Sequence, residues 1–331
     1  MFTFSAKNAK NEENKRVSRI VGGNFSNKIL YLDTDLKPQS KKISFQHPED
    51  LLHEDFYKVK NYKLMDPQKR NVLRSSLKKY YDEEESEESY TGSETEEESE
   101  EEIYFKKAKS IIREKTMKNI ELNDGGKMNI CPDSKPERIY ISGANGSGKS
   151  FIAGVYMKEY HRLYPKNNIF MFSIHDYDKS YKDIDMIRLD LKDPTLTDEP
   201  LDHLKFKNCL VVFDDTDSLQ DKKLQKWIDA LEKALLTDSR KYGVYMLCLN
   251  HMLMNYTKTR EKINECARYV LFPSSGSTYH ITRFLKVYCS MSKDQIKKFL
   301  TSPSRWVCVS LSYGQYVLYD TGAYLLSTSD I

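Results

Sequence analysis

Short apolar runs and segments with helical spacing alternate along the second half of the chain. The apolar runs, which predict buried strands, are Ile139–Ser142, Ile169–Ile174, Asp185–Asp190, Cys209–Asp215, Val244–Asn250 and Tyr269–Phe272. The helical pattern occupies Phe151–Tyr160, Leu219–Thr237, Tyr279–Tyr288 and Lys293–Leu300. Trp306–Leu311 and Tyr316–Tyr319 predict a closing hairpin. Strands that alternate with helices predict an α/β domain with a mostly parallel sheet and helices on both faces.

The first 135 residues lack this regular alternation. Residues 1–15 are polar and predict disorder, whereas Val17–Asp33 predicts two short strands around a Gly-Gly-Asn turn. Residues 82–102 are a run of Glu and Ser that charge repulsion should keep disordered, and Ile103–Leu122 has helical spacing. We therefore divide the chain into an accessory, partly disordered N-terminal region (1–81), an acidic disordered linker (82–102), a helical connector (103–135) and a globular domain (136–331).

Charge is distributed unevenly along the 331 residues. The net charge of +3 averages the acidic linker, which has 13 Asp and Glu and no Lys or Arg, with a remainder that holds 52 basic against 36 acidic residues. A basic body with an acidic segment is typical of a protein with a polyanionic partner. The alternative is a solvated, Lys-rich surface that the acidic linker keeps soluble.

The six scattered cysteines form no C-x-x-C pair, and several lie within apolar runs, so we expect buried free thiols in a reduced compartment. The N-terminus has no signal-peptide pattern, and no run approaches the ~18 apolar residues that span a bilayer. These features predict a soluble, intracellular protein without a membrane partner.

The loop between the first strand and the first helix of the globular domain has the pattern G-x-x-x-x-G-K-[ST]. It ends in Lys149 and Ser150, and strand–loop–helix is the context in which this pattern forms a phosphate-binding P-loop. We expect Lys149 to face solvent and to reach the β- and γ-phosphates of ATP, and the Ser150 hydroxyl to ligate Mg²⁺. The predicted nucleotide-binding residues are Gly143, Ala144, Asn145, Gly146, Ser147, Gly148, Lys149, Ser150 and Phe151.

Two aspartates end the apolar strand about 65 residues after Lys149, which is a Walker B arrangement. Asp214 is placed to hold Mg²⁺ together with Ser150, and Asp215 to polarise an attacking water. A second acid at this point suits hydrolysis, whereas nucleotide switches and many small-molecule kinases need only the metal-binding acid. The alternative is a strand-end turn without catalytic function.

Two further positions are candidates for catalysis. Asn250 ends the next strand, with His251 beside it, where a polar side chain could sense the γ-phosphate or orient water; a strand-end cap is the alternative. Arg240 follows the long helix and could act as an arginine finger, whereas a solvated basic turn is the alternative reading. Arg260 and Arg305 are weaker candidates for the same role.

Several segments between residues 136 and 320 carry a resemblance to a known family. Besides the P-loop, they are Ile169–Ser173, Phe213–Asp217, Ser239–Tyr242, Leu249–His251 and Ser304–Val307. Together they resemble P-loop ATPases of nucleocytoplasmic large DNA viruses, which are similar to poxvirus-type genome-packaging ATPases in the FtsK/HerA group. The resemblance implies a P-loop NTPase of the additional-strand type that works as an oligomer to move or clear DNA.

The same resemblance implies that Lys149 and Ser150 contact phosphate and magnesium, that Asp214 binds the metal and that Asp215 is the base. The chain departs from the family pattern at Lys241, where such proteins often carry His, and at Asn250, where FtsK/HerA enzymes often carry Gln.

The sequence therefore favours a homo-oligomeric, Mg²⁺-dependent ATPase that packages or translocates double-stranded DNA, located in the host cytoplasm, the virus factory or the virion. A P-loop kinase of a nucleoside or small metabolite is one alternative, although no arginine-rich lid is evident. A nucleotide-dependent interaction module, whose residues 1–81 recruit a protein partner, is another. A GTPase is disfavoured because no N-K-x-D motif follows the P-loop.

Overall fold

The computed structural model describes residues 1–7, 12–33, 119–175, 178–198, 202–255, 259–275, 277–312 and 314–326, all of which belong to one compact unit. The acidic linker, most of the accessory region and the connector up to residue 118 lie outside the described residues. Among the described residues, no helix is long and apolar enough to cross a membrane.

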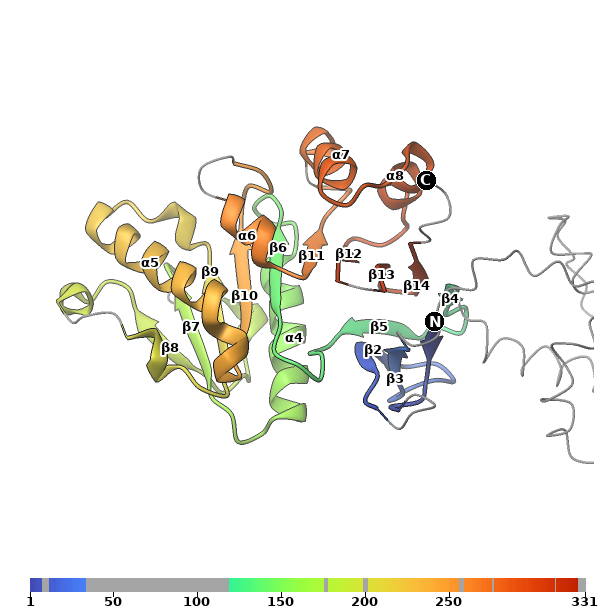
Figure 1. Ribbon diagram of the computed structural model, residues 1–331, viewed down its shortest axis with the longest axis horizontal. Coiled ribbons are helices and arrows are strands. Elements are labelled where there is room, and N and C mark those ends of the chain that lie inside the picture. The colour runs from blue at the N-terminus through green and yellow to red at the C-terminus, as the bar shows by residue number, and fades with distance from the viewer. Residues whose placement is uncertain are drawn as a thin grey trace, which may run out of the picture. The chain divides into compact units, whose positions relative to one another are not determined.

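A ten-stranded sheet in the order β4-β14-β13-β12-β11-β6-β10-β9-β7-β8 is the frame of this unit (Figure 1). Its parallel strands are β6 (Arg138–Ser142), β7 (Ile169–Ser173), β8 (Ile187–Asp190), β9 (Leu210–Asp214), β10 (Tyr245–Asn250) and β11 (Arg268–Leu271). β12 (Val307–Ser310), β13 (Tyr316–Tyr319), β14 (Gly322–Leu325) and β4 (Asn119–Glu121) extend it antiparallel. Since β10 lies between β6 and β9, the expected additional-strand topology is confirmed.

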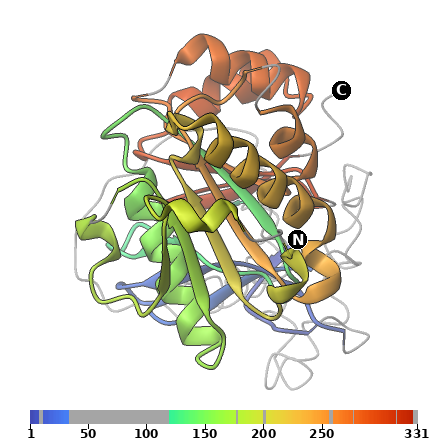
Figure 2. The same ribbon diagram turned by 90° about the vertical axis from the view of Figure 1, so that its left-hand side faces the viewer.

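Helices cover both faces of the sheet, as the sequence predicted. The helices are α4 (Lys149–Leu163), α5 (Lys222–Asp238), α6 (Arg260–Glu265), α7 (Thr278–Val287) and α8 (Lys293–Leu300). The buried side chains of α5 to α8 share one apolar cluster with alternate strand residues such as Tyr140 and Phe213. The intervening residues, such as Ile139 and Val212, are buried outside this cluster, on the face where α4 packs. Figure 2 shows α4 and α5 on opposite sides of the sheet.

The N-terminal residues form a second, four-stranded sheet. It contains β1 (Phe2–Thr3), β2 (Lys15–Val21), β3 (Ile29–Leu32) and β5 (Lys127–Ile130), in the order β1-β3-β2-β5. Gly22 and Gly23, with φ of 75° and 64°, make the turn after β2, so the predicted pair of strands is confirmed. Two other predictions are wrong: residues 1–7 and 12–15 are ordered around the buried Phe2, and the described end of the connector contains strands rather than a helix.

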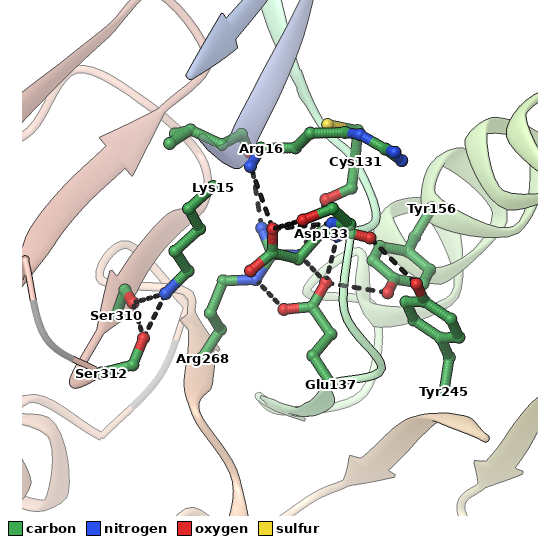
Figure 3. Close-up of polar contacts among 12 residues, drawn as sticks. Lys15, Arg16, Cys131, Asp133, Glu137, Tyr156, Tyr245, Arg268, Ser310 and Ser312 are labelled. Atoms are coloured by element: carbon green, nitrogen blue, oxygen red, sulfur yellow. Dashed lines mark hydrogen bonds and ion pairs between the residues drawn. The ribbon is translucent and has the colours of Figure 1, made fainter. Parts of the chain in front are cut away.

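A buried polar cluster joins the two sheets (Figure 3). Arg268, at the start of β11, is fully buried and donates hydrogen bonds to the Glu137 carboxylate and, at 2.7 Å, to the Cys131 carbonyl. Lys15 of β2 reaches Ser310 of β12 at 3.4 Å. Because a buried guanidinium needs such partners, the N-terminal sheet is an integral part of the P-loop domain, on the α4 face of β11 to β13.

All six cysteines are buried and none forms a disulfide. Burial raises the pKa of the Cys131, Cys209, Cys289 and Cys308 thiols to about 12, so these thiols stay protonated, as expected for core residues.

Candidate functional site

The carboxyl ends of the central parallel strands bring the predicted site residues together. Ser142 at the end of β6 pairs with Asn250 of β10, and Leu249 of β10 pairs with Asp214 of β9. The P-loop therefore leaves β6 at the same edge where Asp215 and His251 follow β9 and β10 (Figure 1). This edge is where α/β folds bind ligands.

Glycines shape the P-loop, as the sequence predicted. Gly146 and Gly148 have φ of 74° and 112°, in the left-handed region that side chains disfavour. A Cβ on Gly143 would lie 2.7 Å from the Phe272 ring, so no larger residue fits there without movement of its neighbours. Arg305 donates hydrogen bonds to the carbonyls of Ser147 at 2.8 Å and Gly146 at 2.6 Å, which holds the loop from outside.

Lys149 lies inside the site rather than in solvent, so the expected exposure is wrong. Its side chain is only 6% exposed, and its ammonium donates to the Gly143 carbonyl at 3.1 Å. It also lies 3.6 Å from Asp215 Oδ1 and 3.3 Å from His251 Nδ1. A buried ammonium needs compensating charge and acceptors, and the residues that follow β6, β9 and β10 supply them.

His251 connects the lysine to the second Walker B aspartate. Its Nε2 lies 3.2 Å from Asp215 Oδ2, while its Nδ1 faces the Lys149 ammonium, which can only donate. The partners therefore favour the tautomer in which Nδ1 accepts from Lys149 and Nε2, beside Asp215, carries the proton. Asp215 itself has φ of 51°, in the left-handed region, so the extended backbone of β9 ends here.

Asp214 occupies a more enclosed position at the end of β9. Its Oδ2 accepts hydrogen bonds from Tyr181 at 3.1 Å and Ser173 at 3.4 Å. Burial, with the charge of Asp215 as the next contribution, raises the pKa of Asp214 to about 6. Its Oδ1 is buried without a hydrogen-bond partner among the described residues, which leaves an acceptor free for a cation.

Ser150 and Asp214 are linked through a side chain that the sequence did not single out. Tyr181, in the short 3-10 turn Lys179–Tyr181, donates a hydrogen bond to Asp214 Oδ2 and interacts electrostatically with Ser150. Asp178 also lies near Ser150; burial by itself would raise the pKa of Asp178, but the hydrogen bond from Ser180 and the interaction with Ser150 lower it. No motif marks Tyr181, because only the fold brings this turn beside the P-loop.

Asn250 does not face the site, so the expected sensor role is corrected. The Asn250 side chain is buried and accepts a hydrogen bond from Lys262 Nζ at 3.1 Å, and Lys262 pairs with Glu232 at 3.0 Å. Successive side chains of a strand point to opposite faces, and at this strand end His251 is the residue that reaches the P-loop lysine. The sequence predicted that successive side chains of this strand alternate between the two faces, but not which of Asn250 and His251 lies on the face of the site.

Arg240 lies at the amino-terminal end of β10, opposite to the carboxyl ends of the strands where the P-loop lies. It is therefore not part of this chain's own site. It belongs to the 3-10 turn Ser239–Tyr242 before β10, where Asn208 N–H donates to the Tyr242 carbonyl at 2.9 Å. The six residues of β10 separate this turn from the P-loop edge, a distance of about 20 Å at ~3.3 Å per residue. Of the three arginines considered, Arg305 contacts the P-loop.

The exposed residues of the loop complete the predicted set. Ala144, Asn145 and Gly146 are exposed, and Phe151 is 62% exposed at the start of α4. Their contact with a nucleotide stays a prediction.

A P-loop between β6 and α4, two acids at the end of β9 and an inserted β10 define an additional-strand P-loop NTPase fold. No family model matches the chain. The chain is 33% identical over 190 residues to the uncharacterized protein V3 of Sputnik virophage, a stretch that covers 56% of this chain and 76% of that protein. The chain belongs to the same family as this virophage protein.

Solved structures with some likeness are more distant. The genome packaging NTPase B204 from Sulfolobus turreted icosahedral virus 2, in complex with ATP-gammaS, is 12% identical with a TM-score of 0.39, over 58% of this chain and all of that chain. The pCW3 conjugation coupling protein TcpA is 13% identical with a TM-score of 0.35, over 65% of this chain and 68% of that chain. Likenesses at these scores are too weak to bear on function.

Proposed function

We propose that this protein binds ATP with Mg²⁺ and hydrolyses it to package or translocate double-stranded DNA, as a homo-oligomer. The observation that carries the ATPase proposal is the buried contact of the P-loop Lys149 with Asp215 and His251. It joins the P-loop to a carboxylate that an imidazole also contacts, since His251 Nε2 lies 3.2 Å from Asp215 Oδ2. Such a carboxylate is suited to accept a proton from water.

Each residue has a distinct role in this proposal. Lys149 contacts the phosphates, with the backbone N–H groups of residues 143–151. Ser150 and Asp214 hold Mg²⁺, for which the unpartnered, buried Oδ1 of Asp214 is a fitting ligand. A divalent cation there favours the charged form of Asp214 despite its raised pKa. Asp215 positions and deprotonates the attacking water, and His251 orients Asp215.

The link to DNA rests on charge. Outside the acidic linker, 52 basic residues stand against 36 acidic ones, which suits a polyanionic partner. In this proposal Arg240 serves the site of a neighbouring subunit. The protein acts inside the host cell, in the cytoplasm or the virus factory, or is carried in the virion. A protein partner for residues 1–81 also stays a proposal; residues 1–7 and 12–33 are themselves part of the domain.

Steady-state ATP hydrolysis with and without double-stranded DNA, together with mass measurement in nucleotide, tests this function. The expected result is Mg²⁺-dependent phosphate release that DNA accelerates, in an oligomer. Lys149→Ala is the inactive reference. Lys158→Ala, an exposed lysine on the same helix α4, is the matched control.

Three outcomes would contradict the proposal. Hydrolysis no faster than that of Lys149→Ala would remove the ATPase assignment. Phosphate transfer to a nucleoside without release of inorganic phosphate would identify a kinase. Very slow hydrolysis that DNA does not change would favour a nucleotide-dependent interaction module.

A further inference from the structure

Helices α7 and α8 form a hairpin inserted between β11 and β12, at the top of Figure 1. The inner side of this hairpin packs into the apolar core through Ile281, Phe284, Leu285, Ile296 and Phe299. The two helices contact each other as well. The hairpin is therefore anchored on one side, and its other side is open.

The open side is basic and partly aromatic. We define the α7–α8 face by its exposed residues Tyr279, Arg283, Lys286, Tyr288, Lys293 and Lys297. Tyr279 is 66% exposed and Tyr288 is 38% exposed. Across residues 277–301 there are five Lys and Arg but a single acidic residue, Asp294.

The cations of this face are not neutralised by the fold. Among the described residues, none of Arg283, Lys286, Lys293 and Lys297 forms an ion pair. Helix α5 is different, since its Lys223 pairs with Asp198 at 3.2 Å and its Lys233 with Glu261 at 2.6 Å. A solvated surface usually mixes both signs of charge, whereas a one-signed cationic cluster is suited to phosphates.

Both ends of the inserted segment touch the P-loop. Phe272, which follows β11, lies against Gly143, where an added Cβ would approach its ring to 2.7 Å. Arg305, just before β12, holds the carbonyls of Gly146 and Ser147. A ligand that binds the hairpin is therefore connected to the P-loop through Phe272 and Arg305.

We propose that the α7–α8 face binds the phosphate backbone of double-stranded DNA and is the surface through which DNA accelerates hydrolysis. The choice of double-stranded DNA as the ligand rests on the proposed function. The basic side chains contact phosphates, and the attachment of the hairpin at Phe272 and Arg305 transmits the binding to the P-loop.

The test compares two quadruple variants of the full chain. The first, Arg283→Gln with Lys286→Gln, Lys293→Gln and Lys297→Gln, removes four exposed charges from the face. The matched control, Lys222→Gln with Lys223→Gln, Lys226→Gln and Lys233→Gln, removes four exposed charges from α5. Binding of a fluorescein-labelled 30-base-pair duplex is titrated between about 50 and 200 mM salt. The slope of log affinity against log salt concentration then reports the number of phosphate contacts.

The face variant should lose about 10- to 100-fold in affinity at ~100 mM salt, and its log–log salt slope should become shallower by roughly 0.9 per lost contact. DNA stimulation of hydrolysis should disappear while the DNA-free rate is unchanged. The control should retain affinity, slope and stimulation.

Contrary outcomes separate this inference from the proposed function. Equal affinity and slope in both variants would overturn the inference and leave the DNA-linked function standing. A parent protein that does not bind the duplex at all would overturn both. A parent that binds DNA through this face but hydrolyses no ATP would support the surface and reject the ATPase.

Discussion

Lys149 Nζ lies 3.6 Å from Asp215 Oδ1, although the two residues follow strands that are not neighbours. β10 separates β6 from β9, and His251, at the end of β10, completes the contact from between them. This relationship makes Lys149 and Asp215 electrostatic partners in the protein alone, so a change in one of them alters the environment of the other.

Lys149→Ala should abolish nucleotide binding and also lower the stability of the fold. The substitution removes phosphate contacts and takes the ammonium away from the Asp215 carboxylate, a loss of roughly 1–3 kcal/mol for a buried group deprived of a partner. Titration with a fluorescent ATP analogue and urea unfolding measure the two effects. Lys158→Ala should change neither, and hydrolysis at the parent rate in Lys149→Ala would refute the assignment of the site.

Asp214→Asn should stabilise the nucleotide-free protein at high pH. The pKa of Asp214 is raised to about 6, above its ordinary value of 3.8, so the folded state binds a proton more readily than the unfolded state. The contribution of Asp214 to stability is therefore greatest below about pH 4 and is lost as pH rises through 6. Asn stays neutral, so at pH 8 the variant should gain up to about 3 kcal/mol, from about two pKa units at 1.36 kcal/mol each.

Urea unfolding at pH 5 and pH 8, in EDTA, checks this expectation. The gain should be larger at pH 8 than at pH 5. The exposed Asp229→Asn on α5 is the control for a charge change alone. An equal effect of Asp214→Asn at both pH values would show that this carboxyl titrates normally.

Asp215→Asn should separate hydrolysis from binding. It keeps the size of the side chain but removes the base, so nucleotide affinity should persist while hydrolysis falls by about 10²–10⁴. Asp214→Asn should instead weaken binding in Mg²⁺ more than binding in EDTA. Affinities with and without Mg²⁺, combined with single-turnover hydrolysis, distinguish the two. Small, equal effects of both substitutions would mean that this strand end is structural.

Asn250→Ala and His251→Ala should have opposite profiles. Asn250 accepts a hydrogen bond from the buried Lys262, so its loss should cost roughly 1–3 kcal/mol of stability and leave the rate per folded molecule unchanged. His251→Ala should reduce the hydrolysis rate, with a smaller effect on stability because its side chain is 34% exposed. If Asn250→Ala had normal stability but did not hydrolyse ATP, Asn250 would be a residue of the site after all.

Arg240→Ala should bind ATP normally yet hydrolyse it poorly if Arg240 reaches a neighbour's site. Arginine fingers contribute about 10³–10⁵ in rate. Mixing Arg240→Ala with Lys149→Ala should restore some activity, because certain interfaces then combine an intact arginine with an intact P-loop. Native mass spectrometry confirms that mixed oligomers form. No recovery in such oligomers would exclude a role in trans, and the position of Arg240 already separates it from its own site.

Local pattern was sufficient for much of this protein. The P-loop at Gly143–Ser150, the strand that ends in Asp214 and Asp215, and the alternation of strands and helices were all predicted, because each depends on short-range spacing. Gly146 and Gly148 adopt the left-handed backbone that the motif implies. The apolar run of β9 is buried along its whole length, as a central strand requires.

Tertiary structure decided the rest, because the deciding partners lie far apart in sequence. The environment of Lys149 depends on Asp215 and His251, which only the insertion of β10 brings to it, and so the expected exposure was wrong. The orientation of β10 in the sheet places His251 beside Lys149 and turns the Asn250 side chain toward Lys262. The polar N-terminal residues fold because Arg268 and Glu137, more than 100 residues away, give their sheet a buried charged anchor. Spacing along the chain contains no information on such long-range compensation of charge.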